Sequence, residues 1–367
     1  MVALVLNSDY ISPAELSGYV REALKDRPIN DLALIDDLLP DTLIDDVDFR
    51  ANITQLGLRR AAKFRTFDTE APQSARKGVA RISGELPPIS EKRILGEYDR
   101  LRLRKADSAI LDIILNDAVE LAEALKTRMI MAKAQAVVTS KVSLAQDGLE
   151  VEADFQRSAG HSVTAATLWS GAADPVLDQE SWFTVFRLLN SGNPARAITS
   201  QRVMSTLMRN PVIKAMCLAP GATQGIVTRE QVNALFTSFG HPPFEIFDAQ
   251  VEDYNGNTVR LIPDDRVLYI ASNGAKLGET LWGITAEAIE SDYNIDATEA
   301  PGVVVGSYIN PDPIQRWTKA SGIGLPILGN SNATMIAKKS SASNSSFWPS
   351  GAPDPLLRPI TRSCSSS

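Results

Sequence analysis

The stretch EYDRLRLRKADSAILDIILNDAVELAEALKTRMIMAKAQA, residues 97–136, decides the fold of this chain. It contains neither proline nor glycine, the residues least compatible with a helix interior. Its apolar side chains recur at steps of three and four, as on one face of an α-helix: Ile110, Ile114, Ala118, Leu121, Leu125, Met129 and Ala132. The pattern predicts one amphipathic helix of about 45–50 Å at 1.5 Å per residue. Such length is typical of a domain's spine, although a long helix in an ordinary bundle would show the same periodicity.

Two stretches before this helix alternate apolar and polar residues, which is typical of β-strands. They are AAKFRTF (61–67) and GVARISGEL (78–86), and the polar stretch DTEAPQSARK joins them. The sequence therefore predicts a long, protruding hairpin. Because an isolated two-stranded ribbon is only marginally stable in water, we expect this hairpin to lie on another surface.

Charge is distributed unevenly over the first 105 residues. Residues 1–50 contain eleven acidic and four basic residues, a net charge of −7, whereas residues 51–105 contain thirteen basic and six acidic residues, a net charge of +7. This complementarity favours contacts between subunits, while a solvated face and a nucleic-acid site are the alternatives. The candidate contact residues of the basic segment are Arg59, Arg60, Lys63, Phe64, Arg65, Phe67, Arg76, Lys77, Arg81 and Ile82. Those of the acidic segment are Asp36, Asp37, Asp41, Asp45, Asp46 and Asp48.

The rest of the chain predicts a mixture of helices and strands. A hairpin is expected around Asp147-Gly148, and a mixed α/β unit with a turn at Asn255-Gly256 is expected after Pro175. Strand-like runs, broken by Pro311, Pro313 and Pro326, follow and are expected to complete the sheet that begins after the long helix. Residues 339–367 are rich in serine and proline, so we expect a disordered tail or one carried over from cloning.

Composition restricts the class of protein. The chain has 367 residues, 44% of them hydrophobic, and a net charge of −7, which argues against a dedicated nucleic-acid binder. Its two cysteines form no disulfide framework or zinc motif, and no apolar run is long enough to span a bilayer. We therefore expect a protein that is neither secreted nor embedded in a membrane.

Motifs that carry chemistry are scarce. His161 and His241 each lie beside a turn signal, and no GxSxG, Walker or GxGxxG motif occurs. The acidic pairs Asp45-Asp46 and Asp264-Asp265 fit solvated turns better than a metal site, which needs convergent oxygen atoms from several segments. The sequence therefore predicts no catalytic residue, no cofactor and no metal.

The order of these features resembles the major capsid proteins of tailed bacteriophages, which have the Hong Kong 97-like fold. More narrowly, it resembles the lambda-like major capsid protein E family, over about residues 15–338. The residues that carry the resemblance are RTFDTEAP (65–72), GELPPISEKRILGEYDRLRL (84–103), RMIMAKAQAVVTSKVSL (128–144), LIPDDRVLYIAS (261–272), LGETLWGITAEA (277–288) and NPDPIQRWTKASGIGLPILGNSNATMIA (310–337). No piece is a strict signature alone, but their order and spacing are fairly specific.

The resemblance implies an α+β fold with a definite division of the chain. Its expected parts are an N-terminal arm (1–50), an extended loop (51–96), a peripheral domain with the spine helix (97–175), an axial domain (176–300), return strands that complete the peripheral domain (301–338), and a tail (339–367).

The resemblance also implies the function. Copies of such a protein form hexamers and pentamers of an icosahedral head around double-stranded DNA, with the extended loop lying across a neighbour. Scaffold, portal and decoration proteins are further expected partners, the virion capsid is the expected location, and the host cytoplasm is the expected site of assembly. An encapsulin-like compartment shell is the first alternative, and an acidic α/β hydrolase is the second.

Overall fold

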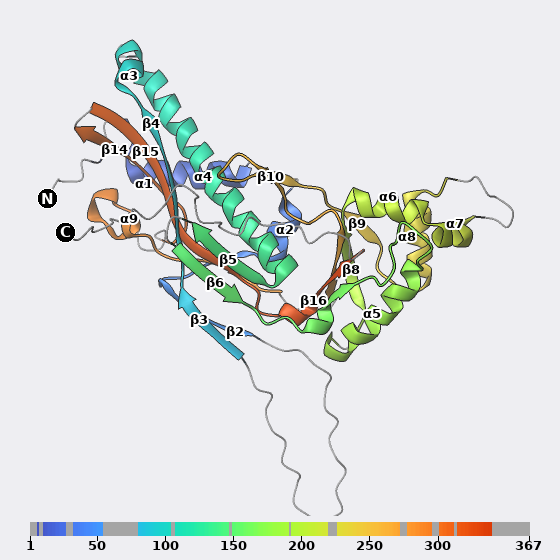
Figure 1. The fold of residues 1–367 in the computed structure, drawn as a ribbon. Helices are drawn as coiled ribbons and strands as arrows, with labels where there is room; N and C mark the ends of the chain where they lie inside the picture. Colours follow the sequence, from blue (N-terminus) through green and yellow to red (C-terminus); the bar gives the residue numbers. More distant parts are fainter. Residues whose placement is uncertain are drawn as a thin grey trace, which may run out of the picture.

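The structure is a computed structural model of the chain. It describes residues 6, 10–26, 32–53, 80–103, 107–146, 149–190, 192–218, 226–271, 277–295, 301–311 and 314–339. Within these ranges the fold is a mixture of helices and sheets, with a long helix at one end and a group of short helices at the other (Figure 1).

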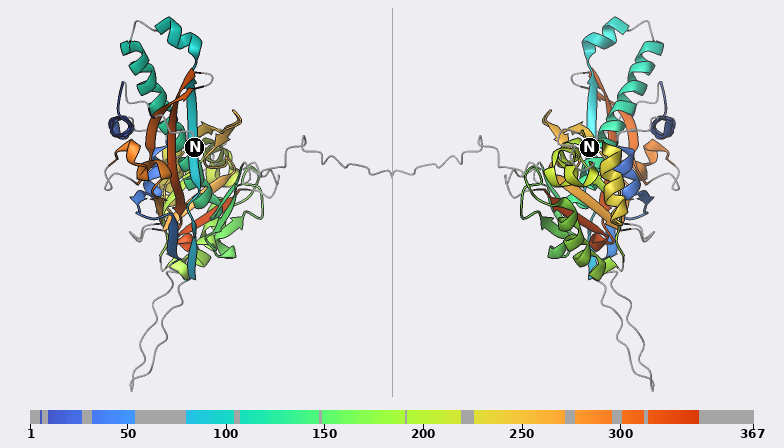
Figure 2. Two further views of the ribbon diagram at one scale, coloured as in Figure 1. Left: turned by 90° about the vertical axis from the view of Figure 1, so that its left-hand side faces the viewer. Right: turned by 90° about the vertical axis from the view of Figure 1, so that its right-hand side faces the viewer.

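The long helix α4 (Asp107–Thr139) packs on the first sheet. The central strand of that sheet, β15 (Ile314–Ile327), is bordered along its length by three others: β14 (Val304–Pro311), β4 (Pro88–Leu95) and β13 (Glu279–Trp282). The short strand β1 (Asp41–Leu43) adds to the edge by pairing in parallel with β13. The side views of Figure 2 show α4 beside these strands. Helix α1 (Pro13–Asp26) lies across α4 and β14, so the buried face of α4 is shared between a helix and a sheet.

The second sheet has the strand order β7-β16-β12-β8-β9 and lies at the other end of the molecule. Its strands are β7 (Ser162–Thr164), β16 (Thr334–Lys338), β12 (Arg266–Ala271), β8 (Pro194–Thr199) and β9 (Phe244–Ile246). The helices beside it are α5 (Pro175–Asn190), α6 (Gln201–Arg209), α7 (Pro211–Cys217) and α8 (Arg229–Ser238). Phe183, Phe236 and Tyr269 are fully buried between helices and sheet, so aromatic packing holds this unit together.

The remaining described elements are short. They comprise the pairs β2 (Asp48–Ile53) with β3 (Ala80–Glu85), β5 (Lys141–Gln146) with β6 (Leu149–Asp154), and β10 (Gln250–Glu252) with β11 (Thr258–Arg260), and the helices α2 (Ala33–Leu38), α3 (Glu97–Leu103) and α9 (Ala286–Ile289).

Arg157 ties the end of α4 to the second sheet. Its guanidinium donates to the carbonyl oxygens of Val137 and Val138 and, at 2.8 Å, to Oγ1 of Thr334 in β16. The last carbonyls of a helix have no partner within the helix, so this cation satisfies them and opposes the negative end of the helix dipole. Burial lowers the pKa of Arg157 to about 10, which leaves it charged at neutral pH.

Most of the predicted elements are present, with two differences. The stretch 97–136 holds two helices, α3 and the first part of α4, on either side of residues 104–106, which lie outside the described residues; α3 buries no residue. Pro326 does not break a strand but lies within β15. The N–H of Gly324, two residues earlier in β15, donates to the carbonyl of Pro87, just before β4. Residues two apart in a strand face the same side, so the nitrogen of Pro326 also faces the β4 side, but beyond the first residue of β4. No hydrogen bond of the sheet is therefore lost at Pro326.

Two predicted hairpins are confirmed by their strands. β5 and β6 flank residues 147–148, which lie outside the described residues, and β10 and β11 flank a turn in which Gly256 has a φ of +78°. Sheet membership crosses the predicted domain boundary between residues 300 and 301 in both sheets. β13 pairs with β15 although it falls within 176–300, and β16 lies in the second sheet although it falls within 301–338.

Candidate subunit-interface surfaces

The base of the predicted extended loop is an antiparallel pair of strands. β2 and β3 pair from Asp48 with Glu85 to Ile53 with Ala80, so the predicted strand at 78–86 is confirmed over residues 80–85. Its described partner is β2, which spans the predicted boundary at residue 50. The predicted strand at 61–67 lies outside the described residues, as do Arg59, Arg60, Lys63, Phe64, Arg65, Phe67, Arg76 and Lys77.

This base is fixed to the subunit by apolar packing. Phe49 of β2 is buried and lies over Gly84, where a Cβ atom would approach its ring to 3.2 Å. Ile82 is half-buried against the central core, whereas Arg81 is exposed. The strands therefore hold both ends of the segment 54–79 in place.

The acidic arm lies against its own subunit through apolar side chains. Ile35, Leu38 and Leu39 of the α2 region are buried in the central core, and β1 extends the first sheet. Thr280 of β13 donates a hydrogen bond to the carbonyl of Leu39 at 3.0 Å. Together with α1, which packs on α4 and β14, this makes the described part of the arm a component of the folded subunit.

Two of the six arm aspartates bind a buried lysine of α4. The ammonium group of Lys133, with only 1% of its side chain exposed, lies 2.6 Å from Asp36 and 2.6 Å from Asp41. Lys126, which lies two helical turns before Lys133 in α4, is 3.6 Å from Asp36. The sequence analysis missed Lys133; its position within the apolar run RMIMAKAQAVV was the available signal. These aspartates hold the arm on α4.

The other four arm aspartates are exposed. The guanidinium of Arg196 has a raised pKa because it donates hydrogen bonds to Glu245, and the charge of exposed Asp37 acts in the same direction. Asp46 accepts hydrogen bonds from the backbone N–H groups of Val47 and Asp48, as in an Asx turn. These four aspartates are therefore exposed to solvent, and their contact with a second copy stays a prediction.

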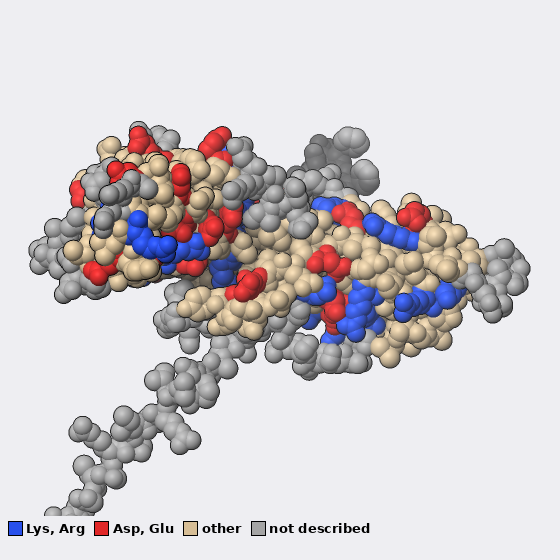
Figure 3. Space-filling model, turned by 90° about the horizontal axis from the view of Figure 1, so that it is seen from above, with Lys and Arg blue, Asp and Glu red and all other residues tan. Residues whose placement is uncertain are grey.

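Acidic and basic side chains are distributed differently at the two ends of the molecule. Seen from above, many Asp and Glu side chains are visible at the end that carries α3 and the start of α4, and Lys and Arg side chains gather at the end that carries α5–α8 (Figure 3). Both signs of charge are present at each end of this face.

Large apolar side chains are exposed at both ends. Leu177, Val185 and Leu188 form a stripe at helical spacing on the outer face of α5, where Leu177 is 62% exposed. Tyr98 and Leu101 of α3 are 70% and 63% exposed. The sequence analysis did not single these residues out, because periodicity alone does not say which apolar face of a helix is covered. We take the stripe on α5 and the pair on α3 as candidate contact surfaces.

Both histidines are on turns, as expected, but are buried. His161 stacks on Phe186 at 5.2 Å between ring centroids, and His241 lies against Phe183 at 4.9 Å. Burial lowers the pKa of each imidazole. Their neighbours are aromatic rings, and they pack as core residues.

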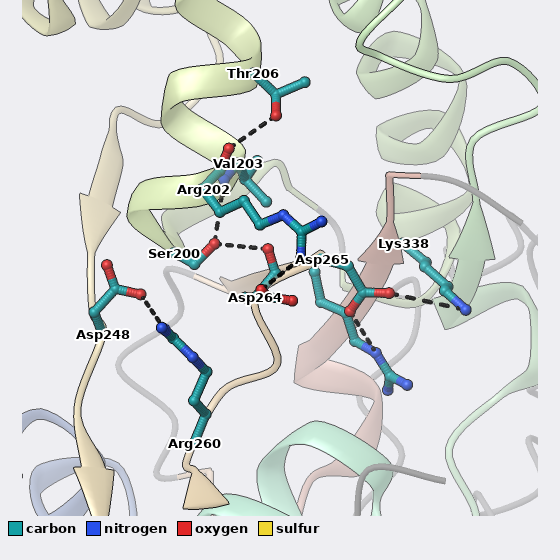
Figure 4. A network of polar contacts seen from close by, with 10 residues as sticks. Ser200, Arg202, Val203, Thr206, Asp248, Arg260, Asp264, Asp265 and Lys338 are labelled. Atoms are coloured by element: carbon teal, nitrogen blue, oxygen red, sulfur yellow. Dashed lines mark hydrogen bonds and ion pairs between the residues drawn. The ribbon is translucent and has the colours of Figure 1, made fainter. Parts of the chain in front are cut away.

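The second acidic pair is satisfied by cations. Asp264 lies 2.7 Å from Arg202, and Asp265 lies near Arg266 and Lys338 (Figure 4). Ser200, the N-cap of α6, donates to the carbonyl of Asp264 in the same network. Among the described residues, no group of three or more His, Cys, Asp or Glu is placed to hold a metal ion. This network connects α6 to the turn before β12.

No helix of the described chain is both long and apolar enough to cross a bilayer. No curated protein matches the sequence. A family model, phage major capsid protein E, matches residues 54–339, which is most of the chain and includes α4, the second sheet, the first sheet apart from β1, and the α5–α8 group.

The chain belongs to the phage major capsid protein E family.

Solved structures agree with this assignment in fold. A prophage capsid protein of E. coli CFT073 is 14% identical, with a TM-score of 0.59 over 89% of this chain and 99% of its own. A phage-related protein of Bordetella bronchiseptica RB50 is 13% identical, with a TM-score of 0.52 over 94% of this chain and 100% of its own. The Hong Kong 97-like fold expected from the sequence is confirmed.

Membership of this family makes the protein a structural, capsid-forming subunit. The match is to phage capsid proteins, so it favours a phage capsid over a cellular encapsulin-like compartment. The surfaces described above are then candidate contacts between copies in a shell.

Proposed function

We propose that copies of this chain assemble as hexamers and pentamers into the icosahedral head of a tailed phage, which encloses double-stranded DNA. The observation that carries the proposal is the family match over residues 54–339. Assembly takes place in the host cytoplasm, and scaffold, portal and decoration proteins are the further partners. The subunit acts through contacts, without catalytic residues.

The surfaces of the subunit support a role in assembly. Residues 54–79 form an insertion held at its base by β2 and β3, and their charge is opposite to that of the exposed arm aspartates. The apolar stripe on α5 adds a second surface at the other end. Exposed ion pairs contribute about 0–1 kcal/mol each, so apolar burial supplies most of the affinity and the charges set register.

The net charge of −7 suits a container for DNA. A shell with a strong positive charge would bind its genome tightly through phosphate contacts, whereas an acidic subunit leaves those contacts weak and sensitive to salt. The genome is therefore held mainly by enclosure.

Electron microscopy of the purified protein tests the proposal. After size-exclusion chromatography, negatively stained samples should show closed polyhedral particles or rings the size of hexamers. A preparation that stays monomeric at all concentrations, with and without co-expressed scaffold, would contradict it. Nuclease-protected DNA in particles from infected cells would support enclosure, whereas particles that hold protein cargo without DNA would favour the encapsulin-like alternative.

A further inference from the structure

A pocket with mostly apolar walls opens where β4, α4, β5 and β15 meet. Its volume is about 70 Å³ for the centres of water molecules, and Pro88, Met129 and Ala132 are among its walls. A single water needs roughly 10–15 Å³ on this measure, so the space equals about five waters, enough for one aromatic side chain.

The space is maintained by residues that have little or no side chain. Gly324 of β15 lines it, and a Cβ atom there would approach the carbonyl oxygen of Leu281 to 2.8 Å and Met129 to 3.0 Å. Ala132 contributes only a methyl group on the α4 side. A side chain at position 324 would therefore collide with its neighbours, so β15 fills none of this space from that position.

One cation lies in this apolar wall. Arg128 is the charged residue among the described residues that line the pocket, and it is half-buried. Burial lowers the pKa of its guanidinium, and Asp253 acts in the opposite direction. An occupant that combines an apolar side chain with a nearby carboxylate would match both features, because it would fill the pocket and add a negative charge beside a partly desolvated cation.

The segment 54–79 contains two phenylalanines with opposite surroundings in sequence. Phe64 lies between Lys63 and Arg65, whereas Phe67 is followed by Asp68, Thr69 and Glu70. Insertion of Phe64 would place the cations of its two neighbours near Arg128, whereas insertion of Phe67 would place two carboxylates there. Charge complementarity therefore favours Phe67 as the side chain that enters the pocket.

We propose that the pocket of one subunit binds Phe67 of a neighbouring copy, with Asp68 and Glu70 beside Arg128. This inference rests on the proposed function and names the contact by which the loop recognises its neighbour. Phe67 is 14 residues after Ile53 and 13 before Ala80, so an extended chain reaches at most about 43–47 Å from its base, at 3.3–3.6 Å per residue. That reach sets the greatest distance between the base of the loop and the pocket that it enters.

Alanine substitutions at the two phenylalanines test the choice between them. Phe67→Ala should raise the concentration needed for shell formation at least tenfold, as expected for loss of a buried aromatic anchor, with an unchanged melting temperature for the dissociated subunit. Phe64→Ala is the matched control and should assemble like the parent. Equal effects of the two substitutions, or none from Phe67→Ala, would overturn the proposal.

Charge exchange tests the carboxylate contact. Arg128→Glu should impair assembly, and the double substitution Asp68→Lys with Glu70→Lys should restore it in that background while impairing it alone. Failure of the exchange to restore assembly by a folded Arg128→Glu subunit would show that these groups do not meet.

Disulfide trapping shows whether the contact joins two copies. Phe67→Cys and Pro88→Cys are combined with Cys217→Ser and Cys364→Ser, and assembled particles are oxidised and run on a denaturing gel. A ladder of dimers and higher species is expected, and Phe64→Cys in place of Phe67→Cys should give much less. Particles that form without a ladder, or with only an intrachain bond, would refute the contact and leave the capsid function intact. Absence of particles from the parent protein would instead count against the proposed function.

Discussion

Lys133 shows how one side chain sets the position of a whole segment. A buried ammonium group is costly unless it is paired, and both of its partners come from the arm, at Asp36 and Asp41. The two aspartates keep partial contact with water, with 28% and 43% of their side chains exposed, whereas the lysine does not. The lysine therefore depends on the aspartates for stabilisation of its charge, whereas water can partly stabilise the charges of the aspartates.

This asymmetry predicts unequal effects of neutralising the two sides. Asp36→Asn with Asp41→Asn leaves an uncompensated buried cation and should lower the free energy of unfolding by about 3–5 kcal/mol. Lys133→Met keeps the volume of the side chain and leaves only carboxylates that water can reach, so its cost should be below about 2 kcal/mol. Urea denaturation of the dissociated subunit measures both, and a Lys133→Met variant less stable than the double asparagine variant would contradict this account.

At the scale of elements, sequence patterns identified what local periodicity controls. The apolar face of α4 could be predicted from apolar residues at steps of three and four. The turn at Asn255-Gly256 could be predicted because Gly256 readily adopts a positive φ. The partner of β3 could not be found in this way, because β2 lies before the insertion and pairing across 26 intervening residues leaves no local signal. Likewise, no pattern within RMIMAKAQAVV shows that Lys133 meets two aspartates about ninety residues away.

The pairing of Ile53 with Ala80 allows the loop to be removed without cutting a strand. Replacing residues 54–79 by Asn-Gly should give a two-residue hairpin turn that joins β2 directly to β3. The packing of Phe49 on Gly84 is retained, so the subunit should fold with a melting temperature close to that of the parent.

This shortened subunit should not form closed shells, because it lacks the proposed contact with its neighbour. Size-exclusion chromatography and electron microscopy measure the outcome, and a chain that ends at residue 339 serves as the control and should assemble. Closed shells from the shortened subunit, of normal size and yield, would show that the insertion is dispensable.

At the scale of the whole molecule, the charge of the first 105 residues divides into an acidic and a basic half. Asp36 and Asp41 bind Lys133 within the subunit, whereas Asp37, Asp45, Asp46 and Asp48 are exposed and stay the predicted contacts of the arm with a neighbour. Exposed charges that attract across an interface act mainly on the rate and register of association, and salt screens them beyond about 10 Å at 0.1 M.

Charge reversal in the basic half should therefore slow assembly in a salt-dependent manner. Arg76→Glu, Lys77→Glu and Arg81→Glu together should reduce the rate of shell formation about tenfold or more at low ionic strength, and the difference from the parent should shrink toward 0.5 M salt as the Debye length falls below about 5 Å. Light scattering follows the rate, and the matching glutamine variant, which removes charge without reversing it, should give an intermediate effect. Reversing Asp45 and Asp48 to lysine in the same chain should recover part of the rate, because these exposed carboxylates belong to the surface that the basic half would meet. If the ratio of the two assembly rates, variant to parent, stays constant across ionic strength, the substitutions act by changing local structure. That result would contradict an electrostatic role of the loop in assembly.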